Sequence, residues 1–126
     1  MKVVLDSGAL IALERNDRAM WRRLKAAQLA GDVPVTHGGV VGQAWRGRGP
    51  RQSLLVKALA GIDVRALDDA LGRAAGELLA LSRSSDVIDA ALVLLADDQD
   101  LIVTSDVDDI EPLALAAGSD VELIRA

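Results

Sequence analysis

Short apolar runs alternate with longer amphipathic segments along this chain. The runs predict short strands, and they are Val3–Leu5, Val33–Val35, Ile62–Val64, Leu101–Val103 and Val121–Ile124. Between them, apolar residues recur at the three- and four-residue spacing of a helix with one buried face. The segments with this spacing are 8–14, 17–30, 37–45, 51–60, 69–81, 86–95 and 107–117. Alternating strands and helices predict an α/β fold, with a parallel sheet and helices on both faces.

Short polar side chains precede most of the expected helices, where they can cap the first turn. The expected caps are Ser7, Asn16 or Asp17, Thr36, Asp68, Ser84 or Ser85, and Asp106 or Asp108. The clearest break is Gly47–Pro50. Because no repeat, low-complexity tract or long linker divides the chain, we expect one domain over residues 1–126.

The composition narrows the chemistry. Half of the 126 residues are apolar, but there are two Trp and no Phe or Tyr, so the core must be aliphatic. There is no cysteine, which excludes disulfides and thiolate metal sites. One histidine, His37, cannot build a zinc site without several carboxylates, and we expect it to start a helix beside Thr36. Any metal is therefore a hard ion held by oxygen.

The charges are spread unevenly. The net charge of −5 argues against nonspecific nucleic-acid binding by the whole surface. Cations gather between Arg15 and Lys25 and again at Arg46, Arg48 and Arg51, whereas acids dominate from Asp86 to Glu122. This distribution fits an acidic metal cleft with basic flanks, and it also fits an ordinary solvated surface. We find no signal peptide and no membrane span, and we expect a cytoplasmic protein that uses no membrane.

Aspartates stand where strands hand over to helices. Asp6 follows the first strand, Asp106 and Asp109 follow the fourth, and Asp86 and Asp89 open the helix between them. In a parallel sheet such positions converge outside the carboxyl ends of the strands. Carboxylates that meet there repel one another unless a cation lies between them, which predicts a Mg²⁺ or Mn²⁺ site.

Each aspartate has an expected role in that site. Asp6 would be the shared central ligand, although a plain helix cap explains it equally well when it is taken alone. Asp89 and Asp106 would complete the ligand set, while Asp86 and Asp109 would hold waters or a second ion. Thr104 and Ser105 would orient a carboxylate or a water. A metal held in this way can activate water for in-line attack on a phosphodiester.

Three segments resemble the signature segments of PIN domains, and more narrowly those of the VapC ribonuclease toxins of bacterial toxin–antitoxin pairs. They are Val4 to Glu14, Ser85 to Ala90, and Val103 to Asp109. The resemblance covers nearly the full length and implies a three-layer α/β/α sandwich with a mostly parallel, about five-stranded sheet. It also implies Mg²⁺- or Mn²⁺-dependent cleavage of RNA, often tRNA or ribosomal RNA, by a homodimer that a cognate antitoxin inhibits. Asp6, Asp89 and Asp106 match the family's aspartates, and Asp86 and Asp109 match accessory acids.

One position departs from the family's pattern. The family usually has a glutamate on the helix after the second strand, where this chain offers Gln43. Either Glu14, two turns beyond Asp6, supplies the missing carboxylate, or the site binds metal more weakly. Ser7, Glu14 and Gln43 are therefore expected to support the site.

The run from Trp45 to Arg51 is basic and rich in glycine. Its three arginines, Arg46, Arg48 and Arg51, are expected to bind RNA phosphates, and Trp45 either stacks on an unpaired base or lies in the core.

Two other functions remain open. A catalytically weakened PIN-like module would hold RNA or a protein without cutting, and Gln43 favours it. A phospho-acceptor domain would also place Asp6 after the first strand, but it needs a late lysine that does not follow Val103–Ser105.

Overall fold

The computed structural model describes residues 1–126 and contains one five-stranded sheet. Its strands are β1 (Val3–Leu5), β2 (Val35–His37), β3 (Asp63–Arg65), β4 (Leu101–Thr104) and β5 (Glu122–Arg125). They lie in the order β3-β2-β1-β4-β5, and every neighbouring pair is parallel. The predicted α/β class with a parallel five-stranded sheet is confirmed.

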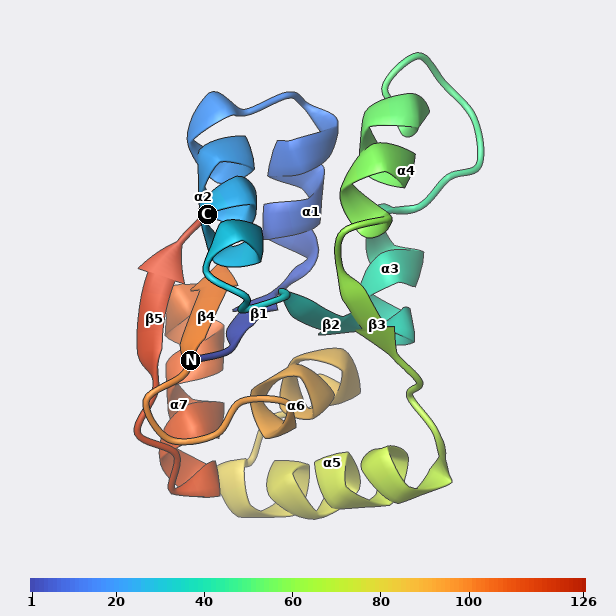
Figure 1. Cartoon of the computed structure of the whole chain (residues 1–126). Coiled ribbons are helices and arrows are strands. Elements are labelled where there is room, and N and C mark those ends of the chain that lie inside the picture. The colour runs from blue at the N-terminus through green and yellow to red at the C-terminus, as the bar shows by residue number, and fades with distance from the viewer.

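Seven helices connect the strands and cover the sheet (Figure 1). They are α1 (Ser7–Glu14), α2 (Arg18–Leu29), α3 (Gly38–Ala44), α4 (Gln52–Leu59), α5 (Asp69–Ser82), α6 (Val87–Leu94) and α7 (Val107–Ala117). Helix α1 packs with α2, α3 and α4, whereas α5, α6 and α7 pack with one another on the other side of the sheet. The result is a three-layer α/β/α sandwich.

The core is aliphatic, as the composition predicts. Twenty-nine buried apolar residues form one cluster, and none of them is aromatic. The central strands β1 and β4 are buried along their whole length, in register from Val3 opposite Leu101 to Leu5 opposite Val103. Edge strand β3 is exposed throughout, so only the middle of the sheet shows the continuous apolar run of a doubly covered parallel strand.

The second strand begins later than its apolar residues suggest. The sequence predicts Val33–Val35, but β2 is Val35–His37. Val33 is exposed, and Pro34 has no N–H to give to a ladder, whereas the polar Thr36 and His37 are buried and pair with β3. The Thr36 hydroxyl makes this burial possible because it donates to the Leu5 carbonyl at 2.8 Å.

Three predicted helix caps are wrong by one or two residues. Helix α1 is capped not by Ser7 but by Asp6, for which a helix cap is one of the two expected roles; α3 is capped by His37 instead of Thr36, and α6 by Asp86 instead of Ser84 or Ser85. Asp17 and Asp68 cap α2 and α5, in agreement with prediction. In each case the true cap is the residue directly before the first helical residue, from which its side chain reaches the backbone N–H two or three residues further on.

The strand order places a topological switch point between β1 and β4. From β1 the chain moves outward to β2 and β3, and the later strands β4 and β5 lie on the other side of β1. The crevice outside the carboxyl ends of two such strands is the usual ligand site of an open parallel sheet. None of the helices combines the length and the apolar character that crossing a membrane requires.

Candidate metal centre and arginine cavity

Asp6 is fixed at the switch point by three hydrogen bonds. Only 5% of it is exposed. Its Oδ1 accepts from the Ala9 N–H at 3.0 Å, and its Oδ2 accepts from the Thr104 hydroxyl at 2.5 Å and the Ser105 N–H at 3.1 Å. Asp6 is therefore a helix cap and also a link between β1 and the end of β4.

Thr104 connects Asp6 to Asp106. The buried Thr104 hydroxyl donates to Asp6 and accepts from the Asp106 N–H at 2.9 Å. Ser105 contributes its backbone N–H, and its side chain lies so close to Gly8 that a Cβ on Gly8 would collide with the Ser105 Oγ. The turn after β4 is thus held firmly against the start of α1.

Asp106 occupies the N-cap position of α7, as one of the two predicted alternatives, but its side chain does not cap the helix. Its exposed side chain makes no capping hydrogen bond, whereas Asp6, Asp17, Asp68 and Asp86 all cap their helices. A helix-capping role therefore does not explain the Asp106 carboxylate, and both of its oxygens are free for another partner.

Asp89 lies in the first turn of α6, where the charges of other aspartates affect its pKa. Burial, the charge of Asp86 and a hydrogen bond with it, and the charges of Asp6 and Asp106 together raise the pKa of Asp89 to about 7. Four carboxylates from three segments of the chain therefore lie within electrostatic reach of one another. A neighbouring cation would remove the repulsion that raises this pKa.

An open hollow of about 340 Å³ adjoins these acids. Its lining includes Asp86 and Asp89 from the start of α6, Asp108 and Asp109 from the first turn of α7, and Arg83. Arg83 ends α5 in the left-handed conformation. The hollow brings Asp86 and Asp89 together with Asp109 and with Asp108, which the sequence marks only as a possible start of α7, but Asp6 and Asp106 are not among its lining residues.

The donor atoms suit a hard divalent ion, but the side chains are not arranged to coordinate one. No three acidic or histidine side chains are arranged to hold a metal ion. The available donors are carboxylate and hydroxyl oxygens, which Mg²⁺ and Mn²⁺ prefer. The residues therefore fit the ion in donor type and in charge.

Glu14 lies apart from these acids. Glu14 is at the far end of α1, eight residues beyond Asp6 and so about 12 Å along the helix axis. It lines a different cavity, and its charge is not among the causes of the raised pKa of Asp89. Gln43 is exposed on α3 and makes no side-chain hydrogen bond. The idea that Glu14 supplies the missing carboxylate is incompatible with this placement.

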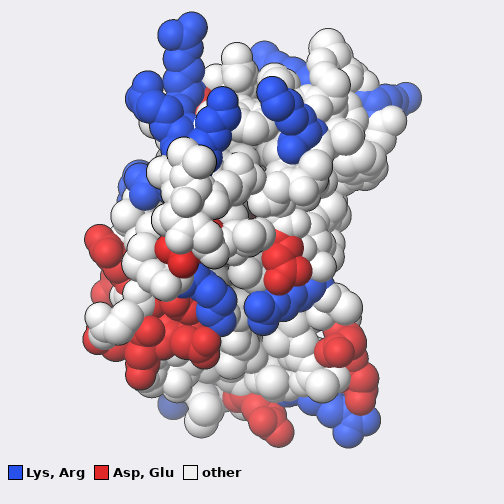
Figure 2. Space-filling view, in the orientation of Figure 1, with Lys and Arg blue, Asp and Glu red and all other residues white.

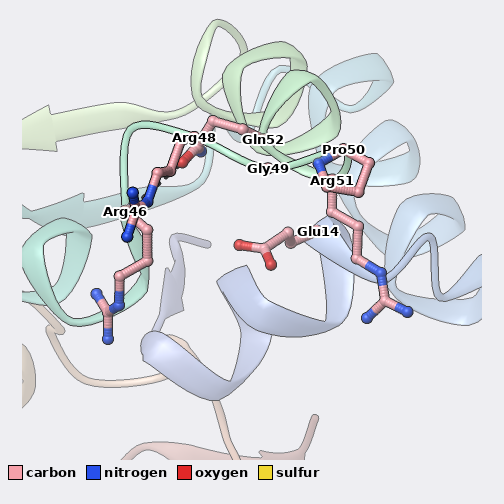
Figure 3. A pocket seen from close by; sticks show the side chains of 7 residues that line it. All are labelled: Glu14, Arg46, Arg48, Gly49, Pro50, Arg51 and Gln52. Carbon is pink, nitrogen blue, oxygen red and sulfur yellow. Dashed lines mark hydrogen bonds between the residues drawn. The ribbon is translucent and has the colours of Figure 1, made fainter.

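The cavity that Glu14 lines is formed mainly by the loop between α3 and α4 (Figure 3). It has a volume of about 370 Å³, and no apolar side chain other than the Pro50 ring lines it; Arg46, Arg48 and Arg51 do. The sequence predicts the three arginines but not that the loop folds over the end of α1. Where a loop lies depends on contacts between residues that are far apart in the sequence, and the spacing of apolar residues carries no information about them.

Trp45 begins this loop and is 40% exposed. Of the two predicted alternatives, burial in the core is therefore wrong. Trp21, in contrast, packs against the core and donates its Nε1–H to the Leu13 carbonyl at 3.0 Å.

His37 is fully buried and joins the two halves of the chain. Its Nδ1 accepts from the Gly39 N–H at 3.1 Å, so its Nε2 carries the proton and donates to the Ile88 carbonyl at 2.9 Å. Burial lowers the pKa of His37, although the bond to Ile88 opposes that shift. His37 therefore starts α3, as predicted, and its neutral ring also holds the turn that carries Asp89.

A second acidic group lies at the opposite edge of the sheet, before β4 and β5. Asp100 accepts from the Lys2 N–H at 2.7 Å and the Asp97 N–H at 2.8 Å. The Lys2 ammonium lies 2.8 Å from Asp97 and 3.7 Å from Asp100. Burial alone would raise the pKa of Asp100, but these N–H groups and the charges of Lys2 and the N-terminus hold it below its ordinary value.

No protein-family model matches the chain, and no curated protein matches it.

Proposed function

We propose that this protein is a Mg²⁺- or Mn²⁺-dependent endoribonuclease of the PIN type, and the toxin of a toxin–antitoxin pair. The observation that supports the proposal is that Asp6 and Asp106 lie within electrostatic reach of Asp89 near the switch point between β1 and β4, and that no lysine or arginine forms an ion pair with any of the three. The resemblance of the three sequence segments to VapC toxins gives the reaction class.

The ion would be held by Asp6, Asp89 and Asp106, with Asp86 and Asp109 near it. When bound, it would supply an activated water and charge stabilisation for phosphodiester hydrolysis. Asp6 has one role that the others lack: its three hydrogen bonds hold one carboxylate in place before any ligand arrives. Such preorganisation removes the need to order that group during the reaction.

Protonation of Asp89 tunes the site. With its pKa raised to about 7, the metal-free protein at neutral pH holds a partly protonated carboxyl group there. A cation competes with that proton, so metal binding releases a proton and strengthens as the pH rises.

The arginine loop is the proposed RNA contact. Arg46, Arg48 and Arg51 offer guanidinium groups that suit phosphates, and the exposed Trp45 offers a face for stacking an unpaired base. Figure 2 shows Lys and Arg gathered mainly over the upper part of the molecule, where α2 and this loop lie. A local cationic surface reconciles RNA binding with the net charge of −5.

The proposed protein partners are an antitoxin and a second copy of the chain. An antitoxin arginine can neutralise the acids in place of the metal, because a guanidinium pairs with carboxylates in two-point fashion. Leu29 on α2 and Val56 on α4 are exposed apolar residues available to an interface. Crystals of the chain alone and with its antitoxin would test both partners.

The proposed activity is tested by single-turnover incubation of total RNA with Mn²⁺, comparing the native protein with Asp6→Asn. We expect discrete cleavage products from the native protein only. Because both oxygens of Asp6 accept from donors, the N–H₂ group of Asn must face one of those donors, and the unfolding midpoint of Asp6→Asn must be measured alongside. Identical RNA patterns from two folded proteins would remove the nuclease proposal.

The second candidate is a PIN-like module that binds RNA or a protein without cutting. Gln43, an uncharged residue at the family's usual glutamate position, favours it, as does the lack of a preformed three-ligand group. RNA binding that persists without any cleavage in Mn²⁺ would select this function.

A further inference from the structure

The cavity under the α3–α4 loop carries polar groups of both signs that the protein leaves without partners. The side chains of Glu14, Arg48 and Arg51 line it and make no hydrogen bond or ion pair. Figure 3 shows the Glu14 carboxylate directed into the space between Arg46 and Arg51. A purely anionic ligand would not explain a carboxylate at the centre of this cavity.

The loop is held in its position from within. Gln52 Oε1 accepts from the backbone N–H of Arg46 at 3.2 Å and of Gly47 at 2.7 Å. Because both partners are donors, the orientation of this amide is fixed, and its buried Nε2 has no partner. The Arg46 guanidinium is also tied back, to the carbonyls of Trp45 and Gly42 at 2.7 and 3.3 Å. The cavity is therefore shaped by the chain itself, while Arg48 and Arg51 stay free.

A ligand that satisfies this cavity needs an anionic group for the arginines and N–H donors for Glu14. A nucleotide has both, since its phosphate suits guanidinium groups and its base carries donors. Of the four RNA bases, only guanine offers two adjacent donors, N1–H and N2–H₂, to the two oxygens of one carboxylate. A volume of about 370 Å³ is at the lower end of the range for small-molecule pockets, which is suitable for one nucleotide.

We propose that this cavity is a binding pocket for one unpaired guanine nucleotide of an RNA, with Glu14 reading the base and Arg48 and Arg51 holding phosphate. The guanine must be unpaired because base pairing occupies the donors that Glu14 requires. The pocket deepens the proposed function, and rests on it in taking RNA as the ligand, by restricting the RNA to single-stranded segments that contain guanosine. Trp45, exposed at the start of the same loop, can stack on a neighbouring base.

The test is binding of 5′-GMP, AMP, CMP, UMP and inorganic phosphate to the full chain in EDTA, measured by calorimetry. We expect GMP to bind about tenfold more tightly than the other nucleotides, a factor within the range that a two-point contact to a base edge provides. Glu14→Gln should remove the preference for GMP, and Arg48→Gln should weaken all four nucleotides. The matched controls are Glu77→Gln and Arg73→Gln, exposed changes on α5 that should alter nothing.

Three results would overturn the pocket. Equal affinity for all four nucleotides and for phosphate would make it a general anion site. An equal gain for every nucleotide in Glu14→Gln would reduce Glu14 to a source of repulsion. An acidic hexapeptide that binds more tightly than GMP would assign the arginines to a protein partner.

Because EDTA stops metal-dependent cleavage, the result is independent of catalysis. GMP binding without RNA cleavage in Mn²⁺ would keep the pocket and remove the nuclease. Cleavage with no preference for any nucleotide would keep the nuclease and remove the pocket.

Discussion

Aspartates lie at both ends of the strands: at their amino ends, which we call the amino edge of the sheet, and at their carboxyl ends, the carboxyl edge. The two groups have opposite electrostatics. At the amino edge, Asp97 and Asp100 are neutralised by Lys2 and backbone N–H groups, and the pKa of Asp100 is lowered. At the carboxyl edge, Asp6, Asp89 and Asp106 have no cationic partner, and the pKa of Asp89 is raised to about 7. Acidic composition alone does not separate the two edges. The protein itself supplies a cation to the aspartates of the amino edge, whereas it supplies none to those of the carboxyl edge.

The largest effect should come from Asp106→Asn. We predict a loss of RNA cleavage of more than about 100-fold, because changes to groups that merely support a metal ligand already cost up to that factor. The unfolding midpoint should stay unchanged, since Asp106 does not cap α7. The rate is measured in single-turnover assays with Mn²⁺.

The matched control is Asp97→Asn, which alters an exposed aspartate of the amino edge. It should leave the cleavage rate as it is. An equal loss of cleavage in the two variants would show that the two edges do not differ in function.

Asp100→Asn should be the most destabilising of the changes at the amino edge. We predict a loss of about 2 kcal/mol of unfolding free energy near neutral pH, because a buried carboxylate loses charge-assisted hydrogen bonds. The lowered pKa sets the pH range: this stability is present above the unfolded pKa and disappears as the pH falls through the folded one. Urea unfolding across the acid range measures it. A loss that persists unchanged in strong acid would contradict this explanation.

Asp89→Asn should change the free energy of unfolding in the opposite direction, toward greater stability. In EDTA at about pH 8, we predict that the variant is more stable than the native protein by about 1 kcal/mol after solvent screening. The folded pKa of about 7 lies above the unfolded value of 3.8, so the native protein loses stability as the pH rises from the lower value to the higher one. His37 has the opposite dependence on pH, so the quantity to follow is the difference between variant and native protein. A destabilised variant above pH about 7 would mean that Asp89 is already neutralised.

The smallest effect should be stabilisation by the ion itself. Millimolar Mn²⁺ should raise the melting temperature of the native protein by a few degrees, since a ligand that binds only the folded state stabilises it by mass action. Asp89→Asn should abolish the rise, and Asp97→Asn should retain it. Differential scanning fluorimetry is sufficient for this comparison, and a rise that is the same in all three proteins would indicate an ion bound elsewhere.

The sequence predicts the carboxyl edge better than the rest of the molecule, for a physical reason. Asp6 directly follows the buried strand β1, and Asp106 is the second residue after the buried strand β4, so the strand ends place them, and apolar runs are easy to recognise. The apolar run places β2 two residues too early. The polar Thr36 can belong to the buried strand because its hydroxyl donates to a carbonyl on another strand. The predicted supporting role of Glu14 in the metal site is wrong for a related reason. The cavity that Glu14 lines depends on a loop about thirty residues further along the chain.

His37 gives the carboxyl edge an internal reporter. Its ring contacts Gly39 on one side and Ile88, beside Asp89, on the other, and it is the chain's only histidine. The ¹⁵N resonances of its imidazole therefore need no assignment, and they give one tautomer with the proton on Nε2 as long as both contacts persist. A titration with Mn²⁺, RNA or an antitoxin can thus be followed at a single buried ring that none of these ligands has to touch.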